Sequence, residues 1–126
     1  MKILLSIKPE YASRIFDGTK RFEYRRSIFT RNDVTNAVVY ASLPIGKVIG
    51  EFAIRRVISA SPLKLWRETR DHAGITKRAF FEYFRGITVG HAIEIKQYTL
   101  YNPPLPLYES FGVTPPQSFM YVNNVS

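Results

Sequence analysis

The sequence predicts an α+β fold: a small mixed or antiparallel β-barrel with helices covering its openings. The predicted elements run in the order strand, helix, three strands, two helices, two strands. Strands outnumber helices, and several consecutive strands lack the crossover helices that a parallel sheet requires. The 126 residues, 45% of them apolar, are enough to bury a core. We therefore expect a single domain over residues 1–126, with its core at about 2–122.

The first predicted elements are a buried strand and an amphipathic helix. The aliphatic run Lys2–Ile7 suits a strand that is buried on both faces. A helix starts at Lys8-Pro9, because proline is favoured at the first helical position. Its apolar stripe faces the core, and Gly18 ends it. The stripe consists of Tyr11, Ala12, Ile15 and Phe16.

Three strands are expected after this helix. Arg21–Arg26 alternates between aromatic and charged side chains, as a strand with two different faces does. A polar loop over 30–36 leads to Ala37–Ser42, a buried aliphatic strand. After a turn comes the long β-rich segment Lys47–Ser59, in which Gly50 marks a bulge or bend.

Two helices and two strands complete the predicted order. Ser61 caps a helix with Pro62 at its first position, and this helix fades near 72–74. Thr76 caps the next helix, which Gly86 ends. The remaining segments are a strand, an extended proline-containing connector and a short last strand, at His91–Tyr101, Pro103–Pro106 and Phe119–Val122.

Charge and composition narrow the classes of function. The net charge of +8 favours an anionic partner such as RNA, DNA, a nucleotide or an acidic membrane surface. The absence of cysteine excludes disulfides, thiol catalysis and cysteine-based metal sites. His72 and His91 are too far apart in sequence to suggest a histidine metal site, so we expect no metal and no cofactor. No apolar run has membrane-spanning length and Met1–Ile7 is too short for a signal peptide, so a cytoplasmic protein is the default expectation.

The segment Gly18–Arg26 carries the most information about function. Read as a strand with a period of two, it places two aromatic side chains on one face and an Arg-Glu-Arg row on the other. If the aromatic face packs on the core, the charged row is either a solvated edge or the floor of an anion-binding cleft. The aromatic pair is Phe22 and Tyr24, and the charged row is Arg21, Glu23 and Arg25.

Three segments of the chain, taken together, resemble the sequence pattern of a known protein family. They are Leu5-Ser6-Ile7-Lys8-Pro9 with its helix, the motif Gly18-x-Lys20-x-x-Glu23-x-Arg25, and Tyr40-Ala41-Ser42 followed by Gly50-Glu51-Phe52. Together they resemble the ASCH family of the PUA-like superfamily, whose hallmark is a G-x-K-x-x-E-x-R type motif after the first helix. The helix Thr76–Phe84 and the strand His91–Gln97 also lie where that family places them. The resemblance covers roughly residues 2–122.

The resemblance implies a PUA-like β-barrel with a cleft along one side. PUA-like domains generally bind RNA or modified bases, so we expect an RNA- or nucleotide-binding module with a basic cleft lined by Lys20, Glu23 and Arg25. A regulatory role is one option for such a module. The alternative is a small hydrolase that acts on a modified nucleoside, as an N4-acylcytidine amidohydrolase does, or on RNA. A third reading is a structural or regulatory protein whose charge aids only solubility or a protein contact.

A hydrolase would need a modified mechanism here. In hydrolase-like members of the family, the motif lysine is thought to activate a threonine three residues on, with a helix-borne glutamate as acid or base. In this chain that third residue is Glu23, and Glu82 is the only carboxylate on the Thr76 helix. If the chain is an enzyme, we expect Lys20 and Glu23 to act directly as a general acid–base pair on an activated water.

The remaining ligand-binding candidates follow from side-chain chemistry. Lysine and arginine suit phosphate, glutamate can accept from a cytosine amino group, and an aromatic ring can stack on a base. Serine hydroxyls could meet a base or phosphate, although they more often bond to local backbone, and a C-terminal serine could close the cleft. The candidates are Ser6, Lys8, Lys20, Glu23, Arg25, Tyr40, Ser42 and Ser118.

Overall fold

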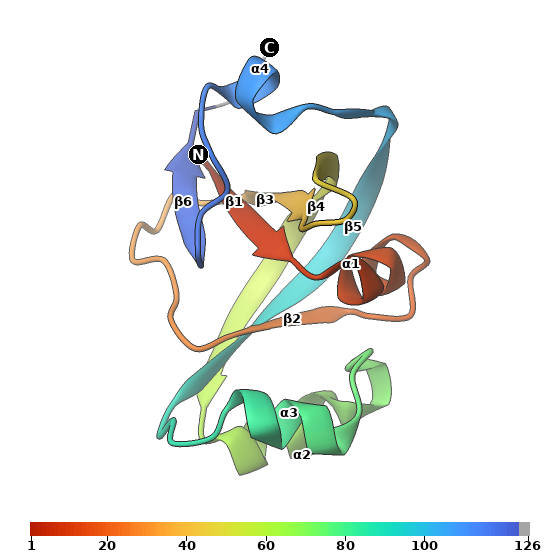
Figure 1. The fold of residues 1–126 in the computed structure, drawn as a ribbon. Coiled ribbons are helices and arrows are strands. Elements are labelled where there is room, and N and C mark those ends of the chain that lie inside the picture. The colour runs from red at the N-terminus through yellow and green to blue at the C-terminus, as the bar shows by residue number, and fades with distance from the viewer. Residues whose placement is uncertain (124–126) are drawn as a thin grey trace.

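Six strands form one curled, mixed sheet in the computed structural model, which describes residues 1–123 (Figure 1). The strand order is β2-β5-β4-β3-β1-β6. Only β1 and β3 run parallel, and the other neighbours are antiparallel. The mixed sheet with covering helices confirms the predicted fold class. The strands are β1 (Lys2–Ile7), β2 (Phe22–Arg25), β3 (Asn36–Ala41), β4 (Lys47–Ala60), β5 (Gly90–Leu105) and β6 (Phe119–Val122).

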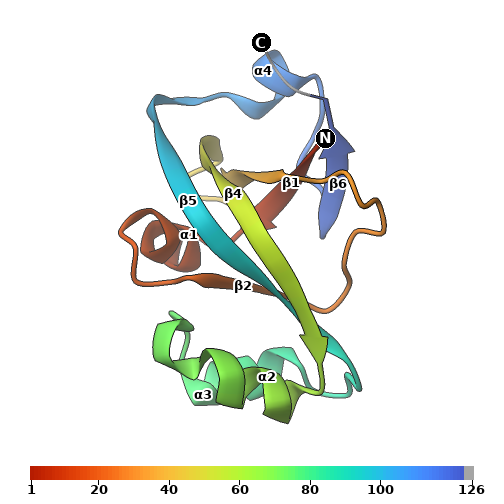
Figure 2. The ribbon, with the colours of Figure 1, turned by 180° about the vertical axis from the view of Figure 1, so that it is seen from behind.

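The helices lie at the openings of the curled sheet. In Figures 1 and 2, α2 and α3 cover one end of the molecule, α4 lies at the other end, and α1 packs beside the middle. Between residues 1 and 123, none of the helices has both the length and the apolar character that crossing a membrane requires. The helical elements are α1 (Pro9–Phe16), α2 (Pro62–Thr69), the 3-10 turn η1 (Arg70–His72), α3 (Lys77–Tyr83) and α4 (Leu107–Phe111).

The two longest strands, β4 and β5, form a ribbon that runs down to the α2–α3 pair (Figure 2). Their pairing register shifts between Val48 and Gly50, which confirms the predicted irregularity at this glycine. A side chain at Gly50 would place its Cβ 2.4 Å from the Thr99 carbonyl oxygen and 2.6 Å from the Phe16 ring. Close approach of backbone and ring therefore requires glycine at this position.

Three buried clusters make up the core. One fills the space between α1 and the sheet, and another lies beneath α4. The third joins β2 to the α2–α3 pair and contains Phe22, Tyr24 and Phe80. Trp66 packs on this third cluster, with its ring centroid 5.0 Å from that of Phe80. The aromatic face of β2 therefore points into the core, as its alternation predicts.

The segment around Pro103–Pro106 differs from the predicted connector. Strand β5 continues to Leu105, which pairs with Val48, and α4 follows directly, which the sequence pattern did not predict. Among the described residues 1–123, β2 pairs only with residues 91–94 of β5, so the later part of β5 has an unpaired edge where proline is tolerated. Burial of Leu107 holds α4 in place through long-range packing.

Candidate functional site

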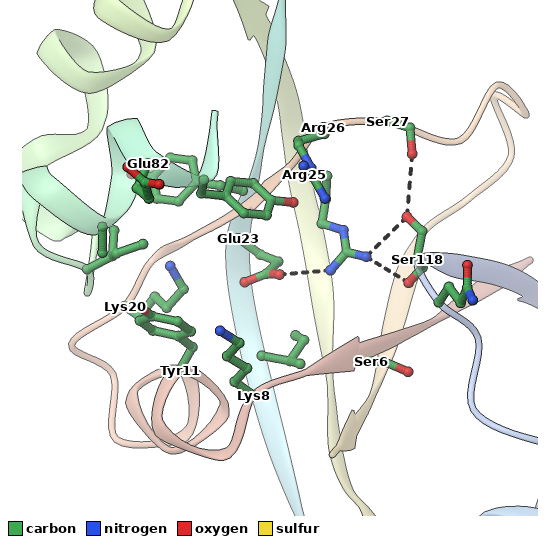
Figure 3. A pocket seen from close by; sticks show the side chains of 16 residues that line it. Ser6, Lys8, Tyr11, Lys20, Glu23, Arg25, Arg26, Ser27, Glu82 and Ser118 are labelled. Atoms are coloured by element: carbon green, nitrogen blue, oxygen red, sulfur yellow. Dashed lines mark hydrogen bonds and ion pairs between the residues drawn. The ribbon is translucent and has the colours of Figure 1, made fainter. Parts of the chain in front are cut away.

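A pocket of about 580 Å³ opens between α1, β2, α3 and the segment that precedes β6 (Figure 3). Its volume lies in the range of small-molecule sites, roughly 300–1,000 Å³. Charged, hydroxyl and aromatic side chains from four parts of the chain meet there. The lining residues are Ser6, Ile7, Lys8, Tyr11, Lys20, Glu23, Tyr24, Arg25, Arg26, Ser27, Ile75, Ala79, Glu82, Tyr83, Gln117 and Ser118.

Lys20 enters the pocket from the turn between α1 and β2. Gly18 reverses the chain with a φ of +85°, and the Lys20 amide then donates to the Arg14 carbonyl. The side chain is only 2% exposed, and its Nζ donates to the Ala73 carbonyl at 2.8 Å. Desolvation by burial lowers the pKa of Lys20 to about 8, although the negative charge of Glu23 opposes this change. The pocket therefore holds an amine that loses its proton more readily than an exposed lysine does.

Glu23 and Arg25 form a buried ion pair on β2, with Arg25 Nη1 3.2 Å from Glu23 Oε2. Arg25 also donates through Nη2 to the Ser118 carbonyl at 2.7 Å and to Ser118 Oγ at 3.2 Å. Its Nε is buried and finds no hydrogen-bond partner within residues 1–123. Because buried donors are normally paired, this Nε is an unusual group in the pocket wall, but its burial closes it to a ligand.

The charged row predicted on β2 divides in the structure. Glu23 and Arg25 are 6% and 8% exposed and line the pocket, whereas Arg21 is exposed and lies outside it. The expectation of one continuous Arg-Glu-Arg row is therefore corrected to a buried pair. Arg25 lies against Ser118 of the C-terminal segment, with Glu23 beside it, and the alternation alone cannot specify such contacts (Figure 3).

Three tyrosines line the pocket, and the sequence analysis did not assign a site role to any of them. Tyr11 and Tyr24 rings lie 5.6 Å and 4.7 Å from Lys20 Nζ, measured to the ring centroids. The Tyr24 hydroxyl is 2.6 Å from Thr69 Oγ1, and burial raises the pKa of Tyr24 to about 12. Burial also raises the pKa of Tyr83. The apolar patterns predicted core-facing positions, and Tyr24 is buried whereas Tyr11 and Tyr83 are half-buried against the core. A phenol in such a position can also face a cavity.

The rim of the pocket carries further charges. Lys8 is exposed at the start of α1, and the exposed Arg26 lies over the Tyr83 ring at 5.2 Å. Glu82 is exposed and pairs with Arg85 at 2.6 Å. Four cationic side chains and two carboxylates thus line the pocket, so its overall charge favours an anion.

The other predicted site residues fall in two groups. Ser6 and Ser118 line the pocket, and Ser6 Oγ donates to the Pro116 carbonyl at 2.8 Å. Tyr40 is buried beneath α4, and Ser42 begins the turn after β3, where its carbonyl accepts from the Ile45 amide. Neither Tyr40 nor Ser42 lines the pocket. Within residues 1–123, no cluster of three or more side chains suits a metal ion.

The curled sheet and its helices belong to a known class of domain. The sequence model of the ASCH domain matches residues 5–110, and this chain therefore belongs to the ASCH family. The crystal structure of ASCH from Zymomonas mobilis superimposes with a TM-score of 0.89 at 25% identity, covering 97% of this chain and 87% of that one. A mutant of the same protein superimposes equally well, at 24% identity. The expected PUA-like barrel is confirmed by these likenesses.

Curated relatives share the sequence at similar levels. An ASCH domain-containing ribonuclease from Zymomonas mobilis is 25% identical over 100 residues, which cover 79% of this chain and 68% of that protein. The large ribosomal subunit protein uL22 of Ureaplasma parvum is 28% identical over 120 residues, or 95% of this chain. The chain spans only 39% of the length of that uL22 protein.

Proposed function

We propose that this chain binds single-stranded RNA and holds one unpaired nucleotide in the pocket. The observation that carries the proposal is the guanidinium of Arg25, which is held in the wall of a pocket rich in cations and tyrosine rings. The ASCH domain-containing ribonuclease among the relatives supports RNA over other polyanions.

Phosphate is the group that we assign to the cationic side of the pocket. Glu23 and Ser118 both hold Arg25, so its guanidinium is oriented before a ligand arrives. Lys8 and Arg26 are exposed at the rim, where they can contact the phosphates on either side of the bound nucleotide. Charge-assisted hydrogen bonds of this kind are about twice as strong as neutral ones.

A base is the group that we assign to the aromatic side. Tyr11, Tyr24 and Tyr83 line the cavity from α1, β2 and α3. Stacking on an aromatic ring is worth about 1–3 kcal/mol per base and depends little on sequence. A base can reach a pocket this enclosed only when it is unpaired and splayed out, so the proposal favours single strands over duplex RNA.

Fluorescence anisotropy with a labelled eight-nucleotide RNA tests this proposal. We expect Lys8→Met and Arg26→Met each to weaken binding and to reduce the salt slope by about 0.7, the value for one phosphate contact on a single strand. Arg25→Lys should weaken binding by about ten-fold or more, because lysine lacks the planar set of donors that a guanidinium presents. Lys96→Met is the matched control, because Lys96 is exposed and outside the pocket. Equal effects in all four variants would exclude the pocket as the binding site.

A second candidate function is cleavage of the bound RNA. The observation in its favour is the Lys20 amine, whose pKa is lowered to about 8 by burial and which lines the same pocket as Glu23. In this reaction the ribose 2′-oxygen attacks phosphorus and the bond to the 5′-oxygen breaks. One of the two groups takes the 2′-hydroxyl proton, and the other protonates the leaving oxygen. The nucleophile of this step belongs to the RNA, so the reaction needs no threonine at the position where this chain has Glu23.

Cleavage is tested by incubating the protein with RNA and, separately, with N4-acetylcytidine. We expect RNA fragments that end in a cyclic phosphate, lost in Glu23→Gln and in Lys20→Met but not in Lys96→Met. Deacetylation of the nucleoside with intact RNA would instead favour an amidohydrolase. Binding without any product would leave the first function alone.

A further inference from the structure

Three successive backbone carbonyls, those of His72, Ala73 and Gly74, form a row that faces the corner between α1 and β2. The His72 carbonyl accepts from the Arg21 amide at 2.9 Å, and the Ala73 carbonyl accepts from Lys20 Nζ at 2.8 Å. The Gly74 carbonyl accepts from Arg14 Nη1 at 2.9 Å. Every carbonyl of this row is therefore used to hold the turn that carries Lys20.

Gly74 lies directly against the lysine side chain. Its φ is +62°, and an added Cβ would lie 2.4 Å from Lys20 Cβ and 2.7 Å from Lys20 Cγ. Contacts this short cannot be accommodated unless the lysine stem or the 72–74 segment moves. The absence of a side chain at Gly74 thus allows the row to close over Lys20.

Arg14 fastens the row from the α1 side without lining the pocket itself. Its guanidinium reaches the Gly74 carbonyl, and its own carbonyl accepts the Lys20 amide at 2.9 Å. One residue of α1 therefore holds both sides of the lysine. Arg14 and Gly74 lie 60 residues apart in the chain, so the arrangement exists only in the folded protein.

We propose that Arg14 and Gly74 are positioning residues. They hold the three carbonyls against the Lys20 side chain and so exclude water from the Lys20 amine at the pocket wall. The role of the Lys20 amine in binding or catalysis rests on the proposed function, whereas its placement by Arg14 and Gly74 does not. If these contacts were lost, water would reach the Lys20 amine and its pKa would rise. The charged and titratable groups that act on it are Tyr11 and Arg14 of α1 and Glu23 and Tyr24 of β2, whereas the row offers it only the Ala73 carbonyl.

The test follows the titration of the Lys20 amine by NMR in protein with ¹³C-labelled lysine, assigned with Lys20→Met. We expect Gly74→Ala to raise the titration midpoint by about one pH unit or more, as water regains access to the amine. Gly86→Ala is the matched control, because Gly86 also has a positive φ of +77° but nothing within 4 Å of an added Cβ. Both variants carry backbone strain, so a purely structural role would affect them alike.

Variants of Arg14 keep the inference testable if Gly74→Ala fails to fold. Arg14→Met removes both the donor to the Gly74 carbonyl and a positive charge that itself lowers the pKa of Lys20. Arg14→Gln removes the charge but keeps an amide donor, so the midpoint should rise more in Arg14→Met than in Arg14→Gln. A folded Gly74→Ala or Arg14→Met protein with the wild-type midpoint would overturn the proposal, as would an equal shift in Gly86→Ala. The titration needs no RNA, so a failure to bind RNA would count against the proposed function and leave this result unchanged.

Discussion

Arg25 Nη2 donates to the Ser118 carbonyl at 2.7 Å, although the two residues are 93 positions apart. The contact attaches the C-terminal segment to the motif strand β2 and makes Ser118 part of the pocket wall. Ser118 lies beyond residues 5–110, the region that the ASCH domain matches. One wall of the pocket is therefore built by sequence outside that region.

Loss of the Arg25 side chain is expected to lower the free energy of unfolding. Arg25→Met removes the partner of Glu23 and leaves a carboxylate that is only 6% exposed without its counter-charge. Breaking a buried pair in this way costs about 3–5 kcal/mol, so we expect a loss of that order in the free energy of unfolding measured with urea. The double variant Glu23→Gln/Arg25→Met should recover part of the loss. Equal losses in the single and double variants would contradict this account.

The stability of the protein should rise with pH in a window set by Lys20. The pKa of Lys20 falls from 10.5 to about 8 on folding, so between these values the unfolded chain binds the proton and the folded chain does not. Stability therefore increases from about pH 8 to 10.5, and below pH 8 the folded protein carries the full penalty of the buried charge.

Lys20→Met isolates this contribution from the other groups that titrate in alkali. We expect the difference in free energy of unfolding, wild type minus variant, to rise by on the order of 3 kcal/mol across the window. Urea denaturation at several pH values measures it, with Lys96→Met as control for the loss of an exposed lysine. A difference that does not change with pH would mean that the Lys20 amine is not desolvated.

Helix α3 should transmit packing changes to the pocket. Phe80 is fully buried and its ring centroid lies 4.9 Å from that of Tyr24, which lines the cavity. Phe80→Leu leaves space beneath α3, and we expect RNA affinity to fall together with stability. Phe52→Leu makes the same chemical change at a buried position in another core cluster. If both variants lose affinity equally, α3 has no special role in shaping the site.

We expect Gly50→Ala to destabilise the protein more than alanine at a glycine with open space around it. The added Cβ would meet the Thr99 carbonyl at 2.4 Å, and neither ribbon strand can move without losing pairing. We expect a loss of about 1–3 kcal/mol or more from this overpacking. Gly112→Ala provides the comparison, because Gly112 has a φ of +70° and open space around it, so its cost is conformational only, about 1–2 kcal/mol. Thermal unfolding that ranks the two in the reverse order would contradict the close approach.

The sequence by itself determined where most elements begin and which residues form the motif. Capping is local, so it can be predicted without a fold: Ser61 accepts from the Lys64 amide and Thr76 from the Ala79 amide, at the predicted helix starts. The alternation of β2 correctly assigned Phe22 and Tyr24 to the core. The aliphatic run Lys2–Ile7 likewise gave the first strand with its observed bounds.

Only the tertiary structure decided what lies opposite each of these faces. A period of two places Arg21, Glu23 and Arg25 on one side of the strand, but the tertiary fold buries only the last two. Burial of Lys20 depends on a carbonyl 53 residues away, and α4 depends on the buried Leu107. Such contacts join distant parts of the chain, and no local pattern records them, because the free energy of a contact depends on both partners and only one is nearby in sequence.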